Sequence, residues 1–167
     1  MDTAQRLCCR GLLPLTAVLC LAAGPGRALR VVGVHDGDTI TCVTPEKEQI
    51  KIRLDAIDAP ELGQPFGQAA KKAMSDKVFG KDVLVVPKKK DRYGRTIGHV
   101  MVDGQDVNLE MLEEGMAWHY EQYDHNKRLR EAEQSARAAK KGLWADEKSV
   151  PPWEFREEHQ HAGRGGR

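Results

Sequence analysis

The sequence predicts a small closed β-barrel of five strands with three peripheral α-helices, an α+β fold. Five short segments are rich in β-branched residues, and several of them alternate apolar and polar side chains. Asp-Gly pairs, which are typical of tight turns, occur beside these segments. Three further segments carry apolar residues at helical spacing, one after the third strand and two near the end of the chain. This order of elements favours one domain with a barrel core.

The five strands are expected at residues 29–34, 39–43, 50–54, 83–86 and 96–102. Asp36-Gly37 lies in the turn between the first two strands, and Asp103-Gly104 follows the last. In the third strand, aliphatic residues alternate with charged ones. Because successive side chains of a strand point to opposite faces, Arg53 is expected to face away from the core, toward solvent or a ligand.

The first helix is expected over residues 66–78, with Gly80 at its C-cap. A second helix covers residues 107–114 and is stopped by Gly115, and a third follows over residues 129–139. Their apolar stripes are core faces. Five strands with one inserted helix and two terminal helices indicate an oligonucleotide-binding (OB) type of barrel.

The two ends of the chain differ from the domain between them. In residues 1–28, two arginines precede an apolar run, and small residues follow it, a pattern typical of a secretory signal peptide. A retained membrane anchor is the alternative, but the apolar run is short for a bilayer span. The expected domain covers residues 29–157, and the polar, glycine-rich residues 158–167 are expected to be disordered. The protein is therefore expected to be exported to the periplasm or the medium, without a membrane contact after cleavage, as a monomer without a stable protein partner.

Charge composition excludes a globally basic surface. The chain has 26 basic and 25 acidic residues, and removal of the three arginines and one aspartate of residues 1–28 leaves 23 and 24. Non-specific coating of nucleic acid is therefore not expected, and any polyanion has to be held locally. Residues 88–95 provide such a cluster, with five cations around Tyr93. Cys42 is the only cysteine beyond the signal peptide, so no internal disulfide is expected.

Carboxylates gather where the predicted strands end. Asp36 and Asp38 lie in the first hairpin, and Asp58 follows the third strand, so three acids are expected to converge. Clustered carboxylates repel one another unless a cation lies among them. A set of oxygen donors without cysteine or histidine suits a hard ion, Ca²⁺ or Mg²⁺. A single EF-hand loop is excluded because the acids are not spaced along one twelve-residue segment.

Three linked motifs resemble the staphylococcal nuclease (thermonuclease) family. They are Asp36-Gly37-Asp38-Thr39, the segment from Arg53 to Glu61, and Asp91-Arg92-Tyr93-Gly94-Arg95. The similarity extends over residues 29–144 and includes Glu114-Gly115-Met116-Ala117 and Gly142-Leu143-Trp144. The resemblance implies a calcium-dependent phosphodiesterase that acts on DNA or RNA, built on a five-stranded OB barrel with three helices.

The resemblance also implies a Ca²⁺ site. Its carboxylate ligands would be Asp38 and Asp58, with the main-chain carbonyl of Ala59 as a further ligand and Asp36 as an outer-shell support. The family usually has threonine in place of Ala59. A main-chain ligand survives that change, so only a side-chain hydrogen bond is lost.

Catalytic roles follow from the same resemblance. Glu61 matches the glutamate that orients or deprotonates the attacking water, and Arg53 and Arg95 match the two arginines that clamp the phosphate. The residues expected to bind the substrate are Arg92, Tyr93 and Tyr123. Glu121 falls where the family often has an aromatic residue, so base stacking is expected to differ.

Two alternatives remain open at this point. One is a nucleic-acid-binding module without catalysis, although related modules lose the acids and arginines that this chain keeps. The other is a calcium-dependent structural domain, which would not require Glu61 beside two arginines. A metal dyad at His35-Asp36 is not supported, because no second His-Asp pair completes it.

Overall fold

The computed structural model describes residues 27–122 and 124–164. All but the last two positions of the predicted signal peptide lie outside this range, and so does Tyr123. The strands are β1 (Arg27–Val34), β2 (Thr39–Val43), β3 (Gln49–Leu54), β4 (Ile57–Asp58), β5 (Asp82–Lys90), β6 (Thr96–Val102), β7 (Gln105–Asp106) and β8 (Trp118–His119). The helices are α1 (Gly67–Val78), α2 (Val107–Glu113), α3 (Lys127–Ala138), the 3₁₀ turn η1 (Gly142–Ala145) and α4 (Pro152–Arg164).

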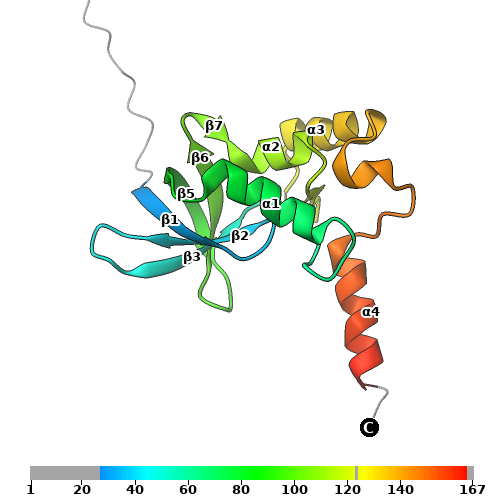
Figure 1. Cartoon of the computed structure of the whole chain (residues 1–167), viewed down its shortest axis with the longest axis horizontal. Coiled ribbons are helices and arrows are strands. Elements are labelled where there is room, and N and C mark those ends of the chain that lie inside the picture. Colours follow the sequence, from blue (N-terminus) through cyan, green and yellow to red (C-terminus); the bar gives the residue numbers. More distant parts are fainter. Residues whose placement is uncertain (1–26, 123, 165–167) are drawn as a thin grey trace, which may run out of the picture.

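Five long strands close into a mixed barrel (Figure 1). Antiparallel pairing runs in the order β3-β2-β1-β5-β6, and β3 then pairs in parallel with β6 to close the ring. Ile52, Leu54 and other aliphatic residues from all five strands fill the interior. The prediction of a five-stranded OB-type barrel with helices is confirmed.

Local sequence explains most element boundaries. Asp103 and Gly104 both have positive φ angles, 50° and 82°, which suits the tight turn between β6 and β7. The Asp106 carboxylate accepts from the amide of Leu109 at 3.3 Å and caps α2, and Asn126 caps α3. In Figure 1 the helices α1, α2 and α3 lie together beside the barrel, and α1 packs against β1 and α2.

A second, smaller sheet connects the barrel to the C-terminal part. In it β4 pairs antiparallel with β8, so that Asp58 lies opposite Trp118. Trp118 belongs to an aromatic cluster with Trp144 and Trp153, separate from the barrel core. Asp58, one of the predicted site residues, is thereby held close to the C-terminal segment that carries Trp153.

The C-terminus differs from the prediction. Residues 158–164, expected to be disordered, continue the helix α4 as far as Arg164. The reason is local, because no glycine or proline interrupts the chain between Trp153 and His161, and glutamate, glutamine and arginine there are good helix formers. Among residues 27–122 and 124–164, no helix is long and apolar enough to cross a membrane.

Candidate active site

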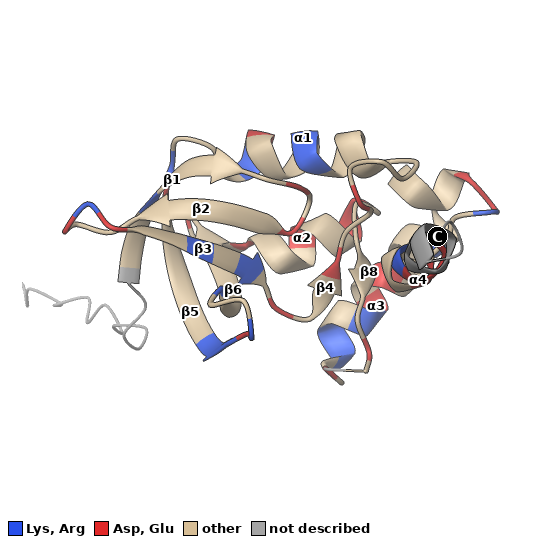
Figure 2. Cartoon of the chain, turned by 90° about the horizontal axis from the view of Figure 1, so that it is seen from below, with Lys and Arg blue, Asp and Glu red and all other residues tan. Residues whose placement is uncertain are grey.

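A cavity of about 770 Å³ opens at the end of β3, beside β4 and the loop between β5 and β6. Figure 2 shows acidic segments around β4 and a basic segment at the end of β3. Nine of the ten predicted site residues line this cavity, and the tenth, Tyr123, lies outside the described residues. Those nine are Asp36, Asp38, Arg53, Asp58, Ala59, Glu61, Arg92, Tyr93 and Arg95.

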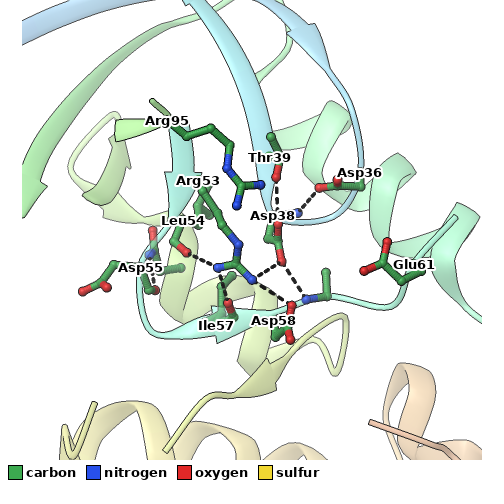
Figure 3. Close-up of polar contacts among 12 residues, drawn as sticks. Asp36, Asp38, Thr39, Arg53, Leu54, Asp55, Ile57, Asp58, Glu61 and Arg95 are labelled. Atoms are coloured by element: carbon green, nitrogen blue, oxygen red, sulfur yellow. Dashed lines mark hydrogen bonds and ion pairs between the residues drawn. The ribbon is translucent and has the colours of Figure 1, made fainter. Parts of the chain in front are cut away.

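Two carboxylates meet at one guanidinium (Figure 3). The Arg53 Nη2 atom lies 2.7 Å from Asp58 Oδ1 and 3.2 Å from Asp38 Oδ2. Both aspartates are buried, and Asp38 Oδ2 also accepts a hydrogen bond from the Ala59 amide at 3.0 Å. The loop that carries Asp38 is held tightly here, since a Cβ atom on Gly37 would lie 2.6 Å from Ala59 Cβ.

Arg53 is fixed by main-chain acceptors as well. Its Nη1 atom donates to the carbonyl oxygens of Leu54 at 3.1 Å and Ile57 at 3.0 Å. Burial opposes the charged form of this guanidinium, yet the adjacent Asp38 and Asp58 carboxylates raise the pKa of Arg53 above its ordinary value. Period-two alternation of β3 had predicted that Arg53 faces away from the core, and its side chain does line the cavity.

Asp36 lies at the edge of this group. Its Oδ1 atom accepts from the Asp38 amide at 3.0 Å, and no ion pair joins it to Arg53. Burial, and then repulsion by Asp38, raise the pKa of Asp36 to about 6. Burial likewise raises the pKa of Asp58, although two arginines oppose that shift. In both carboxyl groups burial is the largest cause of the raised pKa, and repulsion by Asp38 adds to it.

Arg95 is held by its own loop. Its Nε atom donates to Asp91 Oδ2 at 2.7 Å, and Asp91 Oδ1 accepts from the amides of Tyr93 and Arg95. The Arg92 and Arg95 guanidiniums lie 4.8 Å and 5.6 Å from the Tyr93 ring centroid. Tyr93 is 69% exposed, so its ring is available to solvent. Figure 3 shows the Arg95 guanidinium directed toward Arg53.

The donor set fits a hard cation only in part. Asp38 and Asp58 offer buried carboxylate oxygens on either side of one nitrogen, which is the chemistry that Ca²⁺ prefers. In the described chain, however, no three histidine, cysteine, aspartate or glutamate side chains are already gathered as a metal cluster. Two of the three predicted acids converge, and Asp36 instead supports the Asp38 backbone. The calcium assignment stays a prediction.

Comparison with known proteins identifies the family. The model of the staphylococcal nuclease homologue family matches residues 51–146. A protein of Haemophilus influenzae named "Uncharacterized endonuclease" is 42% identical over 93% of this chain and 88% of its own length. A "Micrococcal nuclease" of Shigella flexneri is 39% identical over 79% of this chain and 82% of its own. The chain belongs to the staphylococcal nuclease homologue family. The resemblance inferred from three short motifs is thereby confirmed.

In this staphylococcal nuclease homologue, sequence reasoning left several residues of the cavity wall unassigned, Tyr120 and Arg156 among them. Tyr120 lines the cavity, and its ring stacks on Trp153 with centroids 5.1 Å apart. Arg156 donates to Asp58 Oδ2 at 2.7 Å and to Glu61 Oε1 at 2.8 Å. Trp153 and Arg156 are three residues apart, the spacing of one helix face, but this spacing alone does not show which surface that face packs against.

Proposed function

We propose that this family member is a calcium-dependent nuclease that hydrolyses phosphodiester bonds of DNA or RNA and is exported by a cleaved signal peptide. The assignment to the nucleases rests on the family match and on relatives named as endonuclease and micrococcal nuclease. The observation that supports the chemistry is the convergence of Asp38 and Asp58 on Arg53, in one cavity with Glu61 and Arg95.

The proposed cation site consists of the Asp38 and Asp58 carboxylates and the Ala59 carbonyl. When bound, Ca²⁺ would supply positive charge that offsets the negative charge growing on the phosphate oxygens. The Asp38 side chain is already held by hydrogen bonds from the Thr39 hydroxyl and the Ala59 amide, which lowers the reorganisation that its ligation requires. Asp36 holds the Asp38 backbone and so positions this ligand.

The reaction is the attack of water on phosphorus with loss of the ester oxygen. Glu61 orients the water and accepts its proton, a role that requires an ionised carboxylate. Arg53 and Arg95 donate hydrogen bonds to the phosphate oxygens and stabilise charge as the bond to the leaving oxygen breaks. Arginine suits this role because its planar fork donates two parallel hydrogen bonds and stays protonated.

Substrate contacts extend to the exposed side of the cavity. Tyr93 offers an exposed ring beside the Arg92 and Arg95 guanidiniums, and both cations can approach a phosphate next to a base stacked on that ring. The chain's near-zero net charge makes this local arrangement necessary, because the overall charge does not attract a polyanion.

The test is cleavage of plasmid DNA and of an RNA by the mature protein, with Ca²⁺ or with a chelator. Arg95→Ala is the catalytic variant, and Arg128→Ala, which removes an exposed arginine of α3, is the matched control. We expect cutting only with Ca²⁺, loss of roughly 10²-fold or more with Arg95→Ala, and a normal rate for the control. Binding without cutting would contradict the proposal in favour of a non-catalytic module.

A further inference from the structure

The helix α4 reaches the cavity from the far end of the chain. Its first turn is anchored by Trp153, whose ring stacks on Tyr120 and meets Trp118 edge-on at 5.8 Å. Just before the helix, the Val150 carbonyl accepts from Gln64 Nε2 at 2.5 Å. Beyond this anchored turn, Figure 1 shows α4 extending away from the barrel.

About one helical turn after this anchor, Arg156 points its guanidinium at the proposed cation ligands. Arg156 Nη2 lies 2.7 Å from Asp58 Oδ2, and Arg156 Nη1 lies 2.8 Å from Glu61 Oε1 and 3.3 Å from Asp58 Oδ1. Asp58 is 1% exposed, whereas Arg156 is 36% exposed. The buried carboxylate therefore stays in place, while the arginine comes from the solvent side on a helix that is anchored at one end.

Both carboxylate oxygens of Asp58 already have a guanidinium partner in this arrangement. Its Oδ1 accepts from Arg53, and its Oδ2 accepts from Arg156. A cation needs a lone pair of Asp58 and repels both guanidiniums at ligand distance. When a cation binds Asp58, Arg53 can keep its hydrogen bonds to the two carbonyl oxygens. Within residues 27–122 and 124–164, the hydrogen-bond partners of the Arg156 side chain are the carboxylates of Asp58 and Glu61, so the cation competes most directly with Arg156.

We propose that Arg156 is an intramolecular counter-ion for Asp58 and Glu61 that a divalent cation must displace. This inference rests on the proposed function, because it takes Asp58 as a cation ligand. The docking of α4 is then coupled to the cation: the Arg156 contacts hold the helix on the cavity in the cation-free protein, and cation binding releases it. Release of Arg156 also leaves the Glu61 carboxylate able to orient the attacking water.

Competition of this kind sets a measurable penalty on cation affinity. If the docked form exceeds the released form by a factor K, the apparent dissociation constant for the cation is multiplied by 1 + K. Arg156 contacts two carboxylates through its two terminal nitrogens and is partly exposed, so we expect K to be about 10. Removal of Arg156 should then tighten cation binding roughly tenfold.

The experiment is calorimetric titration of CaCl₂ into the mature protein without nucleic acid. The variants are Arg156→Gln, Arg156→Lys and, as a charge-matched control, Arg128→Gln. We expect Arg156→Gln to bind Ca²⁺ about 5- to 30-fold more tightly than wild type and the control to stay within about twofold. Arg156→Lys keeps the charge but loses the fork, so it should lie between the two. A lysine variant equal to wild type would support the counter-ion role through charge alone, without a contribution from the fork.

Hydrogen exchange gives a readout that does not depend on affinity. Amides of residues 155–159 should exchange faster in wild type when Ca²⁺ is added, because the helix loses its Arg156 contacts. In Arg156→Gln they should exchange fast with or without Ca²⁺. Urea denaturation of each variant verifies that the barrel is intact.

The outcomes separate this inference from the proposed function. Equal or weaker Ca²⁺ affinity in Arg156→Gln, with the wild type binding normally, overturns the role of Arg156 and leaves the calcium site standing. Absence of Ca²⁺ binding in every folded variant overturns both.

Discussion

The substitution Arg53→Lys separates the fork geometry of Arg53 from its charge. The guanidinium reaches four acceptors: the carbonyls of Leu54 and Ile57 at 3.1 Å and 3.0 Å, and the carboxylates of Asp58 and Asp38 at 2.7 Å and 3.2 Å. The carbonyls are bonded to one terminal nitrogen and the carboxylates to the other. A single ammonium nitrogen cannot occupy both positions, so lysine keeps one pair of contacts and loses the other.

Two magnitudes follow from this geometry. Hydrogen bonds that involve a charged group are worth about 1.5–3 kcal/mol each, and lysine recovers part of the loss, so the free energy of unfolding should fall by about 1–3 kcal/mol. In the reaction, lysine cannot present two parallel donors to a phosphate. By analogy with single oxyanion donors, kcat should fall by about 10²- to 10³-fold, or about 3–4 kcal/mol of transition-state stabilisation.

The assay is the initial rate of cleavage of a fluorescent oligonucleotide at saturating Ca²⁺, with urea denaturation at 25 °C for stability. Arg128→Lys on α3 is the matched control and should change neither quantity. A folded Arg53→Lys protein that cleaves within about threefold of the wild-type rate would refute the argument that the fork, and not the charge, is what the site requires.

Three further substitutions test other parts of the structure. Gly115→Ala should lower the free energy of unfolding by about 2–4 kcal/mol in a urea titration, because its φ is +67° and a Cβ there would lie 2.3 Å from the Lys141 carbonyl oxygen; an unchanged midpoint would contradict the strain. Asn108→Ala should cost a similar amount, since the buried amide of Asn108 bonds one main-chain N–H and one carbonyl, and unchanged stability in that variant would mean that water replaces both bonds. In the presence of a chelator, Asp36→Asn should raise the free energy of unfolding by an amount that depends on pH. The folded-state pKa of Asp36, about 6, lies above its ordinary value of 3.8. The stability that this group gives wild type below about pH 4 is therefore lost as the pH rises through 6. The free energy of unfolding of the variant should exceed that of wild type by near zero at about pH 4 and by at most about 3 kcal/mol at about pH 8. A difference that is independent of pH would contradict the charge repulsion by Asp38 and the burial of Asp36.

Much of the barrel could be predicted because its signals are local. The alternation around Ile52 fixes the faces of β3, and with them the direction of Arg53. Asp103-Gly104 specifies its own turn through two positive φ angles. The motif residues reach one cavity because each lies at the end of a barrel strand or in an adjoining loop, and barrel closure brings those ends together.

The parts that could not be predicted depend on contacts between distant segments. The pairing of Asp58 with Trp118 involves strands of two residues each, too short to leave a periodic pattern. The sequence at the end of α4 is polar and contains glycine, so its composition favours disorder. The anchoring of α4 depends instead on the stacking of Trp153 against Tyr120, which are distant in the sequence. Arg156 could not be assigned to the site until that anchoring was known.

The arginines proposed to bind phosphate also have a second role, which is electrostatic. Asp38, Asp58 and Glu61 are brought together by the fold whether or not a cation is present, and buried carboxylates without partners would destabilise it. Arg53 on β3 and Arg156 on α4 supply that compensation. If Ca²⁺ binds as proposed, its charge offsets that of the carboxylates in place of the guanidiniums. The guanidinium nitrogens that were bonded to these carboxylates can then donate to the substrate. A cation-free protein should therefore bind a phosphodiester weakly even though every arginine is present, because those arginines are already paired with carboxylates.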